Sequence, residues 1–159
     1  MATSSATQLA DLALTWNNRL GSADLAMLDA DLASDAGLET AVLLSLGLDR
    51  RAEPDDVPPS GDPTDRRGWW ADQFADVEGD RIGSRLWLLD RSVSTAENGR
   101  RAEEHAREAL QWMLDDRVVS GIDVTIELTA QALFIGVTLH RPGKDPLALR
   151  FAHTWDALT

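Results

Sequence analysis

Residues 94–116 read STAENGRRAEEHAREALQWMLDD, and residues 121–151 read GIDVTIELTAQALFIGVTLHRPGKDPLALRF. In the first stretch apolar residues recur every three or four positions, which predicts a helix with one apolar face over residues 94–116. These residues are Ala102, Ala106, Ala109, Leu110 and Met113. In the second stretch apolar and polar residues alternate at 122–128, 133–139 and 147–151, which predicts three strands joined by short turns. Because an antiparallel meander with one apolar face needs a cover, we expect the helix to lie on it.

The N-terminal part of the chain predicts a hairpin followed by a short helix. Apolar and polar residues alternate on both sides of a turn-forming run at residues 17–21, which predicts a hairpin over about residues 11–33. Apolar residues at helical spacing then predict a helix over about residues 38–48, with Ser34 or Asp35 as its N-cap.

The middle of the chain carries weaker patterns. Residues 51–65, RAEPDDVPPSGDPTD, contain four of the six prolines and five acidic residues, which predicts a surface loop. Residues 82–89 are apolar but too few to distinguish a helix from a buried strand. Together the elements predict an α+β fold. We expect residues 1–10 to be a flexible N-terminus and residues 11–159 to form one domain.

Composition limits the classes of function. The chain has 159 residues, of which 15 are basic and 27 acidic, so its formal net charge is −12. Residues 1–65 hold three of the basic and 12 of the acidic residues. Such a chain is poorly suited to neutralising phosphates, so no nucleic-acid partner is expected. The absence of cysteine excludes disulfides, thiolate zinc sites, iron–sulfur clusters and cysteine nucleophiles, and no cofactor is expected.

The start of the chain does not predict export. Residues 1–8 are small and polar, without the basic and apolar regions of a signal peptide, and no apolar run approaches the ~20 residues that cross a bilayer. We therefore expect a protein that is made without export and has no membrane partner.

Candidate catalytic groups have little support. The three histidines, His105, His140 and His153, lack metal-ligand spacing, and we expect His105 to be a partly exposed residue of the long helix. A glycan hydrolase needs only two carboxylates a few ångströms apart, and a pair such as Asp80 with Glu108 could be nominated. Most of the 27 acidic residues are expected to be solvated surface groups, so a hydrolase is the alternative prediction.

Six tryptophans without any tyrosine are the most unusual feature of the composition. Large aromatic residues are typical of cores, whereas paired tryptophans beside arginines are also typical of interface hot spots, so both interpretations of Trp69 and Trp70 stay open. In an extended segment, at least one of the two must face away from whatever buries the other. Arg66 and Arg67 either pair with nearby carboxylates or recruit an acidic partner. The tryptophans expected in the core are Trp87 and Trp112.

Several short motifs follow one another along the chain. They are DLA at 31–33, LETAV at 38–42, DRRA at 49–52, RRGWW at 66–70, GSRLWLL at 83–89 with Arg91, and RPG at 141–143. With these motifs the sequence resembles the baseplate wedge family of phage Mu and its relatives, over about residues 11–155. That family is similar to the T4-type baseplate wedge and sheath-initiator proteins, whose relatives also occur in type VI secretion baseplates.

The resemblance implies a small α+β fold, a place in the ring of wedges around the tail tube and a role in starting assembly of the contractile sheath. The implied partners are other wedge proteins, the tail sheath and the tube or hub proteins, in a virion tail baseplate that is assembled in the host cytoplasm with several copies in a ring. The T4-type relatives carry a Glu-Pro-Arg motif between the last long helix and the final strands. The matching residues here are Asp115, Asp116 and Arg117, which lack the proline.

We therefore expect an assembly protein without catalytic activity. The residues expected to contact partners are Arg66, Arg67, Trp69, Trp70, Arg85, Arg91, Asp116 and Arg117. The edge of the last strand, residues 151–155, is expected to accept an extended segment of a sheath subunit as an added strand. The alternatives are a small peptidoglycan hydrolase and a free adaptor of the same fold that acts on a bacterial regulator.

Overall fold

The structure is a computed structural model, and it describes residues 11–12, 14–17, 22–25, 27–28, 31–32, 34–35, 37–75, 77, 79–90, 92, 94–129 and 132–154. Its C-terminal part is an antiparallel sheet in the order β7-β8-β9. The strands are β7 (Gly121–Leu128), β8 (Ala132–His140) and β9 (Leu147–Thr154). Val124 lies opposite Val137, and Ile135 lies opposite Phe151, so the buried apolar residues share one face. The predicted meander is confirmed.

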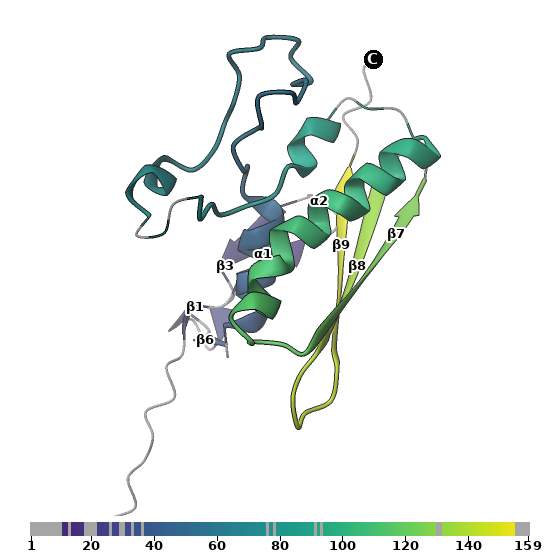
Figure 1. Cartoon of the computed structure of the whole chain (residues 1–159). Coiled ribbons are helices and arrows are strands. Elements are labelled where there is room, and N and C mark those ends of the chain that lie inside the picture. Colours follow the sequence, from purple (N-terminus) through teal and green to yellow (C-terminus); the bar gives the residue numbers. More distant parts are fainter. Residues whose placement is uncertain are drawn as a thin grey trace, which may run out of the picture.

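One long helix, α2 (Ala96–Asp115), covers this apolar face (Figure 1). Thr95 caps its start, where the hydroxyl oxygen accepts a hydrogen bond from the backbone N–H of Asn98 at 3.2 Å. Gly99 allows the helix to approach β7 closely, because a Cβ at this position would lie 2.8 Å from Cδ1 of Leu128. The predicted helix and its place on the sheet are therefore confirmed.

Two side chains of α2 differ from their predicted exposure. His105 is buried, with 6% of its surface exposed, because it faces Arg85 and Asp56 from a segment that crosses the helix. Trp112 was expected in the core but is 39% exposed, and its indole N–H donates to Oγ of Ser45 at 3.0 Å. Both predictions are wrong for the same reason: helical spacing shows which residues share a face of the helix, but not which other segments of the chain cover that face.

In the N-terminal part, the described residues form three short antiparallel strand pairs. They are β1 (Asp11–Leu12) with β6 (Ser34–Asp35), β2 (Leu14–Asn17) with β3 (Ser22–Leu25), and β4 (Met27–Leu28) with β5 (Asp31–Leu32). The β2–β3 pair confirms the inner part, residues 14–25, of the hairpin predicted over about residues 11–33, whereas β4 pairs with β5 instead of continuing it. The ring of Trp16 in β2 meets that of Phe151 edge-on, with 6.2 Å between centroids, and this contact joins the hairpin to the main sheet.

The helix α1 (Leu38–Gly47) confirms the predicted short helix but not its cap. Ser34 and Asp35 belong to β6, and the cap position is Gly37 at φ 81°, without a capping side chain. The carbonyl oxygen of Gly37 accepts the first helical hydrogen bond, from Ala41 at 2.8 Å. Since α1 contacts both β2 and α2, it is buried on more than one face, which explains its strongly apolar sequence.

Residues 48–90, here called the loop segment, run from α1 towards α2 by a long excursion drawn in dark blue to teal in Figure 1. Two short 3-10 helices lie in it, η1 (Trp70–Phe74) and η2 (Leu86–Leu89). The ambiguous apolar run at 82–89 is neither a regular α-helix nor a strand, because its last four residues form the 3-10 helix η2. All four residues of η2 are buried. Residues 51–65 contain turns but no helix or strand, and most of their side chains are exposed.

The loop segment closes on itself next to η2. The backbone N–H of Ser84 donates to the carbonyl of Leu48 at 2.8 Å, and that of Arg50 donates to the carbonyl of Ser84 at 2.9 Å. Gly83 has φ 94°, and a Cβ there would lie 2.4 Å from the carbonyl oxygen of Leu48, so only glycine allows this closure. Within the described residues, no helix has the length and apolar character needed to cross a membrane.

Candidate functional site

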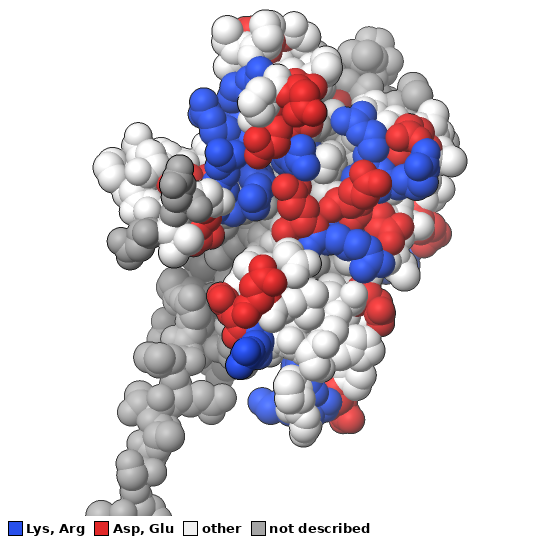
Figure 2. Space-filling model, in the orientation of Figure 1, with Lys and Arg blue, Asp and Glu red and all other residues white. Residues whose placement is uncertain are grey.

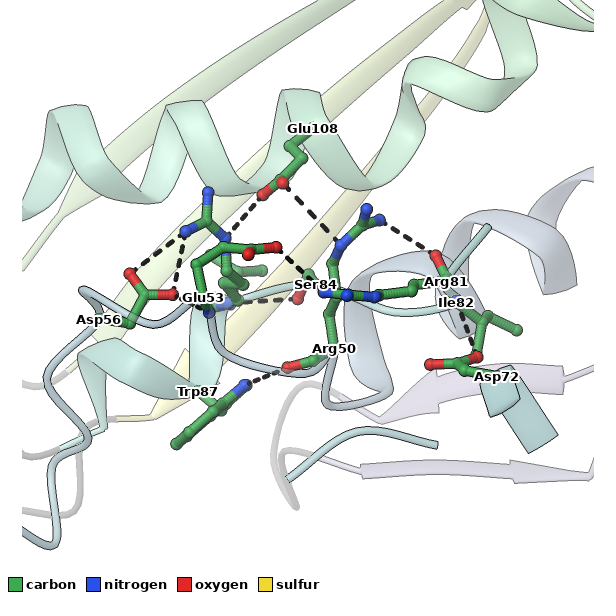
Figure 3. A network of polar contacts seen from close by, with 11 residues as sticks. Arg50, Glu53, Asp56, Asp72, Arg81, Ile82, Ser84, Trp87 and Glu108 are labelled. Atoms are coloured by element: carbon green, nitrogen blue, oxygen red, sulfur yellow. Dashed lines mark hydrogen bonds and ion pairs between the residues drawn. The ribbon is translucent and has the colours of Figure 1, made fainter. Parts of the chain in front are cut away.

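The loop segment is attached to α2 by arginines and carboxylates that lie between the two (Figure 3). Arg85 donates from Nε to Glu108 of α2 at 2.9 Å and from Nη1 to Asp56 at 3.0 Å. Burial alone would lower the pKa of Arg85, but hydrogen bonds to the two carboxylates outweigh it and raise that pKa above its ordinary value. Burial likewise opposes charge on Asp56, yet the backbone N–H of Glu53 and the Arg85 guanidinium lower the pKa of this carboxyl.

A second row of contacts holds the loop segment in shape. Nη1 of Arg81 lies 3.0 Å from Oε1 of Glu53, and Nη1 of Arg50 donates to the carbonyl of Arg81 at 3.0 Å. Arg66 donates to the carbonyls of Glu53 at 2.6 Å and Pro54 at 3.2 Å. Arg66, predicted to contact partners, is therefore used inside the molecule to fix the backbone of the proline-rich stretch.

Arg67 has the largest number of charged neighbours in the loop segment. Its guanidinium lies 2.8 Å from Asp49, 3.7 Å from Asp90 and 3.9 Å from Asp65. It also lies over the ring of Trp87, 4.3 Å from the centroid. These contacts hold Arg67 in the left-handed region, at φ 44°, which is uncommon for a residue with a side chain.

Gly68 follows with φ 100° and lies directly against Arg51, where an added Cβ would be 2.8 Å from Cβ of that arginine. Two successive residues with positive φ turn the chain sharply. The residues after this turn, Trp69 and Trp70, are 45% and 70% exposed. The RRGWW motif is thus a built turn in which the two arginines bind inward and the two tryptophans face out.

The exposed rings form one group, here called the aromatic cluster, which consists of Trp69, Trp70 and Phe74. Ring centroids are 5.9 Å apart for Trp69 and Trp70 and 6.3 Å apart for Trp70 and Phe74, and Phe74 is 70% exposed. Of the two interpretations left open for the tryptophans, burial in the core is wrong. The expectation that at least one ring faces away from the core is exceeded, because both do. Trp87, in contrast, is buried as predicted.

A cleft of about 370 Å³ lies beside the aromatic cluster. The residues that line it are Arg51, Arg67, Gly68, Trp69, Trp70, Asp72, Gln73, Gly79, Asp80 and Arg81. Figure 2 shows the same part of the molecule as a blue arginine surface at the upper left, next to an uncharged lobe. Charged hydrogen-bonding groups and exposed rings therefore share one hollow, a combination that is typical of protein contact surfaces.

The remaining predicted contact residues lie elsewhere. Arg85 is about one-fifth exposed and is used in the ion pairs described above. Asp116 and Arg117 are exposed at the end of α2, with Arg117 at φ 57°, and Figure 1 shows this end of α2 well apart from η1. Arg91 lies outside the described residues. The structure therefore brings Arg66, Arg67, Trp69 and Trp70 together and leaves Asp116 and Arg117 as a separate exposed corner.

The carboxylate pair nominated for hydrolysis is not a free pair. Glu108 is held by Arg85 at 2.9 Å and approached by Arg50 at 3.8 Å, whereas Asp80 lines the cleft beside the aromatic cluster. Nε2 of His140 lies 2.6 Å from Asp123, on the exposed side of the sheet. Among the residues that the structure describes, no group of three or more His, Cys, Asp or Glu side chains could hold a metal ion.

Sequence reasoning missed several residues that build this surface. Phe74 completes the aromatic cluster, and Glu108, Asp56 and Arg81 anchor the loop segment. A signal was present for Phe74, since it follows Trp70 at the spacing of one helical turn. The charged partners had no signal, because they lie among many similar acids and are 13 residues (Glu53–Arg66) to 29 residues (Asp56–Arg85) from the arginines that they bind.

Comparison with known proteins places the chain among phage proteins. A family profile described as "Phage protein GP46" matches residues 38–146. The chain is 42% identical over 134 residues to "Baseplate protein gp46" of Escherichia phage Mu, covering 82% of this chain and 88% of that protein. It is 37% identical over 116 residues to "Mu-like prophage FluMu protein gp46" of Haemophilus influenzae, covering 73% and 75%. The resemblance to the Mu family inferred from the motifs is confirmed, and this chain belongs to the phage GP46 family.

Proposed function

We propose that this protein is a structural component of a contractile phage tail baseplate, and that it acts by contact with other baseplate proteins. The relative from phage Mu is a baseplate protein, and the structure supplies a surface suited to such a role. The observation that carries the proposal is the aromatic cluster, because three large rings stand exposed on a segment that ion pairs hold in place. The protein is then located in the virion tail and has no catalytic activity.

The exposure of the cluster has a physical cost that a partner would remove. Trp70 and Phe74 are each 70% exposed, although burial of such a side chain is worth roughly 1.5–3 kcal/mol. Tryptophan and arginine dominate interface hot spots because they offer large contact area with few rotatable bonds or several fixed donors. An exposed group of this kind next to a polar cleft is what a partner surface would bury.

The arginine contacts have a different task in this proposal. Arg66, Arg67 and Arg85 bind carbonyls and carboxylates of the same chain, so they hold the aromatic cluster in one position before any partner arrives. A surface that is ordered in advance loses less entropy on binding. We assign Trp69 and Trp70 to direct contact, and Arg66, Arg67 and Arg85 to positioning. Asp116 and Arg117 are proposed as a second contact corner.

The finer role that the resemblance implies, joining wedge proteins and helping to start sheath assembly, is part of the proposal. In this proposal the place of contact is β9, which is the last strand of the order β7-β8-β9. An extended segment of a sheath subunit could add there by backbone hydrogen bonds. We further propose that residues 11–159 act as one unit in a ring of wedges around the tail.

The experiment is co-expression with the other baseplate proteins of the same genome, followed by purification of the complex. Trp69→Ala and Arg67→Ala are expected to reduce incorporation more than they lower the melting temperature. Trp87→Ala is the matched control, because Trp87 is 3% exposed and its loss should mainly lower stability. If Trp69→Ala lowers the melting temperature strongly and assembly is intact, the aromatic cluster is a stability feature and the proposal fails. A peptidoglycan zymogram with the purified protein tests the hydrolase alternative.

A further inference from the structure

The cleft beside the aromatic cluster contains a positive charge that the protein does not use. Five arginines of the loop segment, Arg50, Arg66, Arg67, Arg81 and Arg85, each bind a carboxylate or a carbonyl of the chain. Arg51 lines the same cleft, is exposed, and has no ion pair or hydrogen bond from its guanidinium to any described residue. This is notable in a chain with 27 acidic residues, since local carboxylates are abundant.

The position of Arg51 is fixed although its charge is free. Gly68 lies against it so closely that a Cβ at Gly68 would be 2.8 Å from Cβ and 3.2 Å from Cα of Arg51. The turn that presents Trp69 and Trp70 therefore also packs against Arg51, which lines the cleft. A guanidinium and exposed rings, held at a fixed spacing, match a ligand that carries a carboxylate and an adjacent apolar group.

We propose that the cleft binds an extended acidic segment of another baseplate protein, with a carboxylate on Arg51 and the neighbouring apolar side chains against Trp70 and Phe74. This inference rests on the proposed function and adds the chemistry of the partner. Three arginines and two aspartates line the cleft, and Arg67 and Arg81 are already paired with carboxylates of the chain, so the cation that is left for a partner is Arg51. Most of this acidic protein would repel a carboxylate, so the free guanidinium of Arg51 is the contact that would fix where an acidic segment binds.

A second copy of this chain is a poorer occupant. Its most acidic exposed stretch is residues 53–65, but Glu53, Asp56 and Asp65 are already bound to arginines within the same chain. Asp62 accepts two hydrogen bonds from Thr64, at 2.8 and 2.7 Å. Docking any of these four acids into a neighbouring copy would require these contacts to break, which leaves only the exposed Asp55 of this stretch for such a contact.

The test uses the full-length chain in the co-expressed baseplate complex. A photo-crosslinking amino acid, p-benzoylphenylalanine, replaces Gln73, which lines the cleft, and in a matched control replaces Gln111, which is exposed on α2. We expect a cross-link from position 73 to a segment of another baseplate protein that contains Asp or Glu within a few residues, and no such cross-link from position 111. A cross-link to a segment without acidic residues, to a second copy of this chain, or to nothing in an assembled complex would overturn the inference.

Charge exchange provides the second arm. Arg51→Glu should reduce recovery of the complex by about tenfold or more, whereas Lys144→Glu, which changes the net charge equally on a distant turn, should not. An Asp→Arg or Glu→Arg change at the cross-linked acid should restore recovery in the Arg51→Glu background and weaken it in the wild type. If Arg51→Glu assembles normally while Trp69→Ala does not, this inference fails and the proposed function survives. If neither change affects assembly, both fail.

Discussion

The two halves of the molecule are stabilised in different ways. Where α2 covers the meander, Leu110, Met113, Leu133 and Leu139 have at most 1% of their surface exposed, and apolar burial dominates. The loop segment has a small buried cluster of its own, which consists of Ala52, Trp87 and Leu88. Leu86 and Leu89 of η2 join the main core, and the rest of the segment is held by guanidinium groups bound to carboxylates and carbonyls, around Arg85 and Arg67 in particular.

This difference explains how the chain can expose three aromatic rings without losing its fold. Apolar burial is non-directional, so a loop held by it alone would turn its largest rings inward. Bidentate and charge-assisted hydrogen bonds have fixed directions, so they can hold a backbone turn that faces outward. The helix and sheet therefore supply stability, and the arginine contacts supply position. Some substitutions should therefore lower the stability of the fold, and others should disturb the position of the loop segment while the fold stays intact.

The largest effect is expected in the helix and sheet. Leu110→Ala removes a side chain with no exposed surface, and the resulting cavity should lower the free energy of unfolding by about 2–5 kcal/mol. Denaturant unfolding followed by circular dichroism measures this loss. Val57→Ala is the control, because Val57 is 75% exposed and should change stability by less than about 0.5 kcal/mol. A small loss for Leu110→Ala would show that α2 is not held mainly by burial.

A smaller effect is expected where the loop segment joins α2. Arg85→Ala leaves Asp56 and Glu108 partly buried without their cation, which should cost about 1–3 kcal/mol. The loss should be local, so proteolysis within residues 51–65 should become faster while the far-ultraviolet signal of α2 persists. Glu104→Gln, on the exposed side of the same helix, is the control. Uniform protection against protease in Arg85→Ala would show that other contacts hold the segment.

The comparison also separates what sequence could and could not predict. The meander and α2 follow from alternation and three-to-four spacing, because each face of these elements is set by residues close in sequence. The same logic predicted α1 but not its cap, since β6 takes Ser34 and Asp35 into a strand pair. A local sequence pattern therefore predicts a helix or strand correctly only where the segments that pack against it are themselves regular helices or strands.

The loop segment shows the opposite case. RRGWW could be recognised as a motif, but whether Trp69 and Trp70 were core or contact residues depended on where Arg67 found its carboxylates. Those partners come from residues 49, 65 and 90, and nothing in their spacing identifies them among 27 acids. Ion-pair choice is a three-dimensional property, and sequence gives only the list of candidates.

A pH effect is expected at the junction between the two halves. The pKa of His105 is lowered below its ordinary 6.5, mainly by burial and then by the nearby positive charges of Arg85 and Arg101. The negative charges of Glu108 and Asp56 oppose this shift but do not outweigh it. Below pH 6.5 the unfolded chain binds a proton that the folded protein resists, so stability should fall as the pH drops from 6.5 towards the pKa of folded His105. The loss is about 1.4 kcal/mol for each unit by which the pKa is lowered.

His105→Gln removes this titration and should flatten the dependence of unfolding free energy on pH between 7 and 5. Asp56 acts in a lower window, because its pKa is lowered from 3.8 and its stabilising contribution is lost only as the pH falls through that lower value. Denaturant titrations at several pH values distinguish the two windows. An unchanged slope between pH 7 and 5 in His105→Gln would show that His105 is accessible enough to protonate freely in the folded state.

The smallest effect on stability, and the sharpest test of the division between the two halves, is expected from Trp70→Ala. The Trp70 side chain is 70% exposed, and its ring contacts among the described residues are with Trp69 and Phe74 of the aromatic cluster. Its loss should therefore change the free energy of unfolding by less than about 1 kcal/mol. Incorporation into the co-expressed baseplate complex should nevertheless fall strongly, because a hot-spot tryptophan can contribute about 2 kcal/mol or more to binding. Paired measurements of unfolding and of complex recovery on the same preparation decide the matter. A variant that loses several kcal/mol of stability would place Trp70 with Leu110, as a residue that holds the fold, and would remove the main reason to regard the loop segment as a presenting surface.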